Sequence, residues 1–153
     1  MKAQYVNPFY QATVEVFKLM MDVEINRNKN DLLQKMLDKK EVGVMIEITG
    51  DLCGSILYRF PEKMILEMVK IMSGMEIEEL DSFVTSALGE VSNIISGNAI
   101  SKLSGENYQC DIKPPQIIID ENKPVDLTEG EVLKIPLETT IGELQIQMSL
   151  KES

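Results

Sequence analysis

The sequence contains no histidine and no tryptophan, and aromatic residues make up only 5% of it. Without histidine there is no imidazole base, no Ser-His catalytic pair and no imidazole ligand for a metal ion. The two cysteines, Cys53 and Cys110, do not form a zinc site by themselves. Because no secretion signal is visible, we expect both to be reduced. Any catalysis must therefore use carboxylates, amides, hydroxyls or lysine.

Basic residues and long apolar runs are also scarce. Lysine and arginine number 15 against 25 acidic residues, and the formal net charge is −10. With no basic cluster to neutralise phosphates, this balance argues against a nucleic-acid partner. No apolar run approaches the ~20 residues that span a bilayer, and the N-terminus lacks the apolar region of a signal peptide. We therefore expect a cytoplasmic protein that does not insert into membranes.

The length and the hydrophobic pattern predict one domain over residues 1–153, with mixed helices and antiparallel strands. Helices are expected from Pro8 to about Asp22, from Pro61 to about Met72 before Gly74, and from Leu80 to Leu103. Strands are expected over 41–49, onward to Phe60, then over 108–112, 116–119, 131–138 and 143–150, with 26–30 as a loop. Pro136 lies within one of these strands, which suggests an edge or irregular position. The predicted fold class is α+β, with helices covering one side of an antiparallel sheet.

The helix expected over 80–103 carries the most informative pattern in the chain. At 100° per residue, most of its large apolar residues gather on one arc: Phe83, Val84, Ala87, Leu88, Val91, Ile94 and Ile95. Ser86, Glu90 and Asn93 follow i, i+4, i+7 spacing and line up beside that arc, and Gly97 continues the line. We call these four residues the polar stripe. A carboxylate and an amide one turn apart, flanked by small residues, can enter the cleft of another molecule.

The polar stripe also fits an ordinary solvated helix surface. Two features favour a functional role. Gly89 and Gly97 each cost roughly 1 kcal/mol relative to alanine inside a helix, and Asn93 is a weak helix former. Asn98 projects onto the middle of the apolar arc, so we expect it to be buried and satisfied by backbone groups.

The acidic residues before this helix have two readings: Glu76, Glu78, Glu79 and Asp81. They suit the positive end of the helix dipole, and such an acidic run could also be mistaken for a metal site. We favour a solvated helix N-terminus over a metal site.

The run from Ser86 to Ala99, SALGEVSNIISGNA, resembles the active helix of the CheC/CheX/FliY chemotaxis phosphatases. The family pattern is Asp or Ser, three residues, Glu, two residues, Asn, and a proline a little over twenty residues later. Pro114 and Pro115 fall one or two places short of that proline. The segments 7–13 and 50–54 also resemble the family's opening and its first hairpin turn. A single Glu-x-x-Asn motif, where CheC-type members generally carry two, makes the chain most similar to CheX.

The resemblance implies helices on a long antiparallel sheet, homodimers formed through the sheets, and hydrolysis of the aspartyl phosphate of a CheY-type response regulator. It implies that Asn93 orients the attacking water and that Glu90 pairs with the regulator's active-site lysine. Ser86 occupies the Asp-or-Ser position, where we expect helix packing or water contact, and Gly97 adjoins the partner. It implies no cofactor bound by this chain itself, because the Mg²⁺ belongs to the regulator.

Two alternatives remain open on the sequence. The same helix could dock on a receiver domain or on the flagellar switch without hydrolysing anything. The chain could also be an unrelated α+β subunit whose polar stripe is only surface. A scaffold could keep both Glu90 and Asn93, so the sequence separates these readings poorly.

Overall fold

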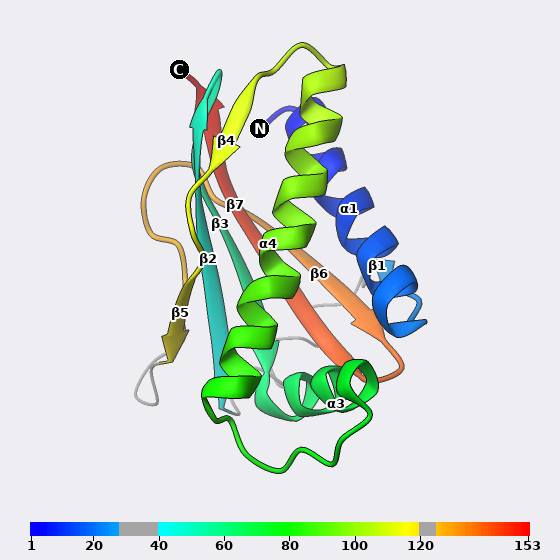
Figure 1. Ribbon diagram of the computed structural model, residues 1–153. Helices are drawn as coiled ribbons and strands as arrows, with labels where there is room; N and C mark the ends of the chain where they lie inside the picture. The colour runs from blue at the N-terminus through cyan, green and yellow to red at the C-terminus, as the bar shows by residue number, and fades with distance from the viewer. Residues whose placement is uncertain (28–39, 120–124) are drawn as a thin grey trace.

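The computed structural model describes residues 1–27, 40–119 and 125–153. In that part of the chain, three helices pack on one face of a seven-stranded antiparallel sheet (Figure 1). The helices are α1 (Ala3–Met21), α3 (Glu62–Ser73) and α4 (Ser82–Gly105). The strands are β1 (Asn26–Arg27), β2 (Glu41–Gly50), β3 (Leu52–Pro61), β4 (Cys110–Ile112), β5 (Gln116–Ile119), β6 (Leu133–Thr139) and β7 (Gly142–Glu152). The predicted α+β class, with helices on one side of an antiparallel sheet, is confirmed.

The sheet is built around two long hairpins whose second strands pair with each other. Its order is β1-β6-β7-β3-β2-β4, and β5 pairs with β2 alongside β4. The corner between β2 and β3 falls at Gly50, whose φ of +112° is a conformation that L side chains rarely adopt. The predicted last strand, β7, lies between β6 and β3 and is therefore internal.

The main core lies between the helices and the sheet. Alternate strand residues point into it, as the period-2 pattern predicts; they include Val42, Val44, Ile46, Ile48, Ile56, Tyr58, Leu144, Ile146 and Met148, all at most 1% exposed. Met64 and Met68 of α3, which are four residues apart, also contribute to this core and are fully buried. No helix among the described residues is long and apolar enough to cross a membrane.

Two local expectations were wrong. Pro8 does not begin a helix but lies inside α1, which starts at Ala3. The preceding turn is held by burial of Tyr5 and Val6, so tertiary packing outweighs the local signal of the proline. Asn26 and Arg27 are not loop residues, because they pair with Glu138 and Leu137 of β6. Residues 28–30 of the expected loop lie outside the described residues.

The face of the sheet away from the helices is partly covered by the segment 125–131. Arg59 on β3 bonds both Glu41 (Nη2–Oε1 2.6 Å) and Asp126 (Nη1–Oδ1 2.9 Å). Gln147 on β7 donates to Asp126 at 2.7 Å and accepts from the backbone N–H of Leu127 at 2.8 Å. These contacts explain why Gln147, which the alternation pattern places on the polar side of its strand, is fully buried.

Candidate functional site

The helix α4 is anchored at both ends and along its side. It begins after Asp81, whose Oδ1 accepts a hydrogen bond from the backbone N–H of Val84 at 2.9 Å. Asp81, one of the four acidic residues before the helix, is therefore its N-cap. Beside it, α1 runs along the same face of the sheet (Figure 1). Lys102 on α4 donates to Glu15 on α1 at 2.9 Å. The helix therefore presents a fixed outer face.

The polar stripe lies on that outer face. Ser86 and Glu90 are exposed, and Asn93 and Gly97 are partly exposed. The buried residues of α4 lie on the side of the helix opposite the stripe; they include Leu88, Ser92, Ile95 and Ala99. The structure therefore brings the four predicted site residues together on one solvent-facing line.

The polar side chains of the stripe have no bonding partner in the part of the chain that the structure describes. Among residues 1–27, 40–119 and 125–153, neither Glu90 nor Asn93 has a hydrogen-bond or ion-pair partner for its side chain, and Ser86 has none either. Glu90 and Asn93 are three residues apart, which is about 4.5 Å along the helix axis. A carboxylate and an amide held at this spacing can bind two neighbouring points of one cleft at once.

The buried face of α4 is rotated away from the predicted apolar arc. Ser92 and Ser96 are fully buried, while Phe83 is 47% exposed. Tyr58 of β3 reaches the helix here, with its Oη 2.8 Å from Ser96 Oγ. Ser92 Oγ donates to the carbonyl of Leu88 at 2.9 Å. Burial raises the pKa of the Tyr58 hydroxyl, so this group stays neutral and serves as a hydrogen-bonding partner.

The rotation overturns the expectation for Asn98. We expected it to be buried on the middle of the apolar arc, but it is exposed. The buried face of α4 includes Ser92 and Ser96 beside Leu88, Ile95 and Ala99, so the position of Asn98 moves to the solvent side. Tyr58 and Ser96 were missed by sequence reasoning. Serine at i and i+4 between apolar positions is a weak signal, and only the structure pairs Ser96 with a residue 38 positions away.

The break between β4 and β5 lies beside the stripe. Both strands pair with β2, at residues 48–50 and 42–45, and Pro114 and Pro115 separate them. A Cβ added to the buried Gly89 would lie 3.5 Å from Cγ of Pro115 and 3.7 Å from Ile117. These are ordinary contact distances, so the proline segment packs beside α4 at Gly89, one turn from Asn93, and leaves room for a methyl group there.

Gly97 has a different environment. A Cβ added there would meet no atom within 4 Å. Packing within the described chain therefore does not require glycine at this position, although it costs roughly 1 kcal/mol in a helix interior. Close approach of a partner to α4 would account for it.

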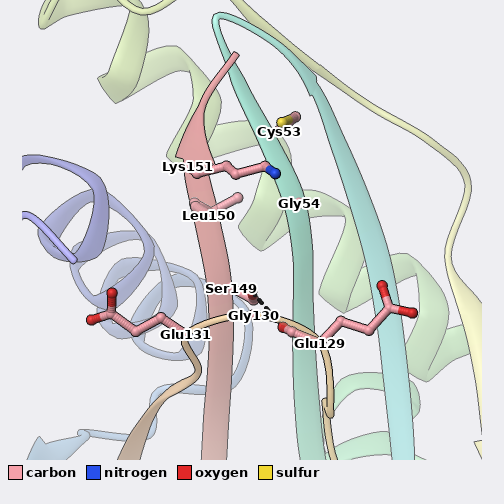
Figure 2. A pocket seen from close by; sticks show the side chains of 8 residues that line it. All are labelled: Cys53, Gly54, Glu129, Gly130, Glu131, Ser149, Leu150 and Lys151. Carbon is pink, nitrogen blue, oxygen red and sulfur yellow. Dashed lines mark hydrogen bonds between the residues drawn. The ribbon is translucent and has the colours of Figure 1, made fainter.

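The hollows on the other face of the sheet lack convergent chemistry. One, of about 330 Å³, lies between β3, β7 and the segment 125–131 (Figure 2). Ser149 Oγ donates to the carbonyl of Glu129 at 2.9 Å, and the carboxylates of Glu129 and Glu131 point in opposite directions. Within the described ranges, no three acidic or cysteine residues are grouped so that they could hold a metal ion. The polar stripe of α4 is therefore the candidate site.

Comparison with solved structures identifies the architecture. A CheC-like superfamily protein from Shewanella sp. PV-4 superimposes with a TM-score of 0.82 at 27% identity, covering 99% of both chains. The complex CheX-CheY-BeF3-Mg²⁺ from Borrelia burgdorferi matches with a TM-score of 0.78 at 23% identity, covering 97% of this chain and 98% of that one. Three helices on one face of a long antiparallel sheet are thus the fold of CheC-like proteins.

Sequence comparison then specifies the family. The model of the family "Chemotaxis phosphatase CheX" matches residues 42–138, and the chain belongs to this family. The CheY-P phosphatase CheX of Thermotoga maritima is 28% identical over 138 residues, which are 90% of this chain and 88% of that protein. The family match contains α4 with the whole polar stripe.

Proposed function

We propose that this protein hydrolyses the aspartyl phosphate of a phosphorylated CheY-type response regulator. The observation that carries the proposal is that Glu90 and Asn93 lie next to each other on the outer face of α4. Among the described residues, neither side chain has a bonding partner. Membership in the CheX family and the similarity to a CheY-P phosphatase support it. The neighbouring structure in which a CheX protein is bound to CheY supports the same class of partner. The activity is proposed for the cytoplasm.

In the proposed mechanism, Asn93 positions the attacking water. An aspartyl phosphate is a reactive acyl phosphate, and phosphoryl transfer passes through a loose transition state. The water then needs alignment more than deprotonation. The amide carbonyl of Asn93 accepts a hydrogen bond from the water, while its NH₂ group donates elsewhere. This division suits a chain that has no histidine base.

Glu90 is proposed to anchor the helix on the regulator. Burying a carboxylate is costly unless it meets an opposite charge, and the proposed partner is the lysine of the regulator's active site. Ser86 and Gly97 border the contact at the two ends of the stripe. The Mg²⁺ belongs to the phosphorylated substrate, and no cofactor of this chain enters the mechanism.

The direct test is to mix the purified protein with CheY phosphorylated in the presence of Mg²⁺ and to follow loss of the aspartyl phosphate. We expect hydrolysis to accelerate in proportion to the added protein. Binding of the phosphorylated regulator without acceleration would contradict the phosphatase proposal and favour a non-catalytic receiver-binding or flagellar-switch module.

We also propose that the protein forms a homodimer through its sheet. In the described part of the chain, β4 and β5 form one edge of the sheet, and no further strand pairs with their outer side. An open edge favours aggregation, and pairing with a symmetric copy removes that risk. Sedimentation at micromolar concentration should give a dimer, and a monomer would contradict this proposal.

A further inference from the structure

The stripe continues at its N-terminal end into an exposed aromatic side chain. Phe83 is 47% exposed. It lies seven residues before Glu90, so the two residues differ by only about 20° around the helix and by about 10 Å along its axis. Phe83 is therefore in line with Glu90, two turns away, on the same outer surface of α4.

A second apolar surface borders the stripe on the side of Gly89. Pro115 and Ile117 lie next to Gly89, and Ile119 follows on the same strand with 45% of its surface exposed. Ile119 is the register partner of Val42, a residue of the helix-covered core. Directly paired residues share a face of the sheet, so Ile119 lies on the same side of the sheet as α4.

We propose that Phe83 is an apolar anchor for the receiver domain of the response regulator, with Ile119 on the opposite side of the stripe. This inference rests on the proposed function, because it assigns the docking surface of the same site. The four residues of the stripe are too few for a specific complex, since a stable interface covers about 800 Å² and 20–30 residues on each partner. Residues bordering the stripe must contribute, and aromatic side chains supply a large share of binding energy in such contacts.

The partner that we assign to Phe83 is a receiver domain and not a second copy of this chain, because Phe83 and the polar stripe form one continuous surface on α4. A second copy seated on Phe83 would cover Glu90 in the same dimer and block access to the catalytic residues. The proposed dimer instead uses the edge formed by β4 and β5, which leaves the outer face of α4 open.

The experiment measures binding of CheY carrying beryllofluoride and Mg²⁺ to Phe83→Ser, Phe83→Leu and the wild type. We expect the Kd of Phe83→Ser to rise about tenfold or more, a typical loss for an aromatic anchor. Phe83→Leu retains apolar area and should lose less. The KM for hydrolysis of phosphorylated CheY should rise with the Kd, with a smaller change in kcat.

Leu19→Ser is the matched control. Leu19 is 87% exposed near the C-terminal end of α1, away from the stripe. Its substitution should leave binding and hydrolysis unchanged, and circular dichroism should show that all variants are folded. Ile119→Ser tests the other border and should also weaken binding; because Ile119 lies on β5, at the edge proposed for the dimer, sedimentation should show that this variant keeps the oligomeric state of the wild type.

The outcomes separate this inference from the proposed function. If the wild type hydrolyses phosphorylated CheY but Phe83→Ser binds equally well, the docking assignment is wrong and the function stands. If Leu19→Ser weakens binding as much as Phe83→Ser, the docking assignment is also wrong. If the wild type binds the beryllofluoride form through Phe83 without hydrolysing the phosphate, the docking assignment stands and the phosphatase proposal fails. If Phe83→Ser converts a dimer into a monomer, a second copy occupies this surface and the inference is overturned.

Discussion

The hydroxyl groups of Tyr58 and Ser96 lie 2.8 Å apart inside the core and join β3 to α4. Ser96 lies three residues after Asn93, about 60° from it around the helix, on the buried side that faces the sheet. This contact therefore fixes the rotation of α4 about its axis, which decides where the polar stripe points. A polar contact at this place specifies one rotation of the helix, whereas apolar packing alone would accept several similar ones.

The two substitutions at this contact should have unequal costs. Ser96→Ala leaves the Tyr58 hydroxyl buried without a partner and should lower the free energy of unfolding by about 1–3 kcal/mol. Tyr58→Phe should cost less, about 1 kcal/mol, because the Ser96 hydroxyl can then bond the carbonyl one turn back. Urea unfolding followed by circular dichroism measures both. Ser101→Ala, at an exposed serine of the same helix, is the control and should change stability by less than about 0.5 kcal/mol.

The double variant tests whether the contact exists in solution. If Tyr58 and Ser96 are bonded, the double substitution should cost less than the sum of the single ones. Costs that add fully would mean that the two hydroxyls act independently, and the role assigned to this contact in orienting α4 would be wrong.

Asn93→Ala should remove most of the rate acceleration. Loss of one oriented catalytic contact lowers kcat by about 10²-fold or more, while folding and regulator binding should change little because Asn93 has no described partner within the chain. Asn98→Ala is the matched control, since Asn98 is an exposed asparagine on the same helix outside the stripe. Single-turnover hydrolysis measures both. A rate for Asn93→Ala within about twofold of wild type would exclude water positioning by this residue.

Gly97→Ala should stabilise the fold and weaken binding of the phosphorylated regulator. A methyl group at position 97 meets no atom of the described chain, so the better helix propensity of alanine should raise the free energy of unfolding by about 0.5–1 kcal/mol. If a partner approaches α4 here, KM should rise, and Gly97→Leu should raise it further. Gly105→Ala, at the exposed last residue of α4, should leave KM unchanged. A stabilised Gly97→Ala variant with wild-type KM would show that the partner does not reach this position.

The elements of the fold follow from local patterns, but their contacts do not. The spacing of Ser86, Glu90 and Asn93 predicts one line on α4, and the structure has that line. A prediction from hydrophobicity alone treats Ser92 and Ser96 as surface residues and Phe83 as a core residue. The predicted buried face of α4 is therefore rotated toward Phe83, whereas Phe83 is 47% exposed and both serines are buried. Their burial depends on Tyr58, which lies far away in the sequence. Burial of Gln147 likewise depends on Asp126 and Leu127, a pairing that no period within β7 contains.

Glu90→Ala separates two roles for this carboxylate. As a general base, Glu90 would accept the proton of the attacking water, and its loss should lower kcat with little change in KM. As an anchor, it would pair with the regulator's lysine, and its loss should raise KM. We expect the anchor, because a loose transition state needs little deprotonation of the water. The spacing along α4 agrees, since one group can hold the regulator while Asn93 reaches the water.

The measurement is hydrolysis by Glu90→Ala over a wide range of phosphorylated regulator concentrations, with Glu90→Gln beside it. Glutamine keeps the shape and removes the charge, so as an anchor it should lose most of the affinity that alanine loses. If saturating regulator restores most of the wild-type rate for both variants, Glu90 acts in binding. If the saturated rate stays lower by orders of magnitude, Glu90 takes part in the chemistry, and Asn93 does not position the water alone.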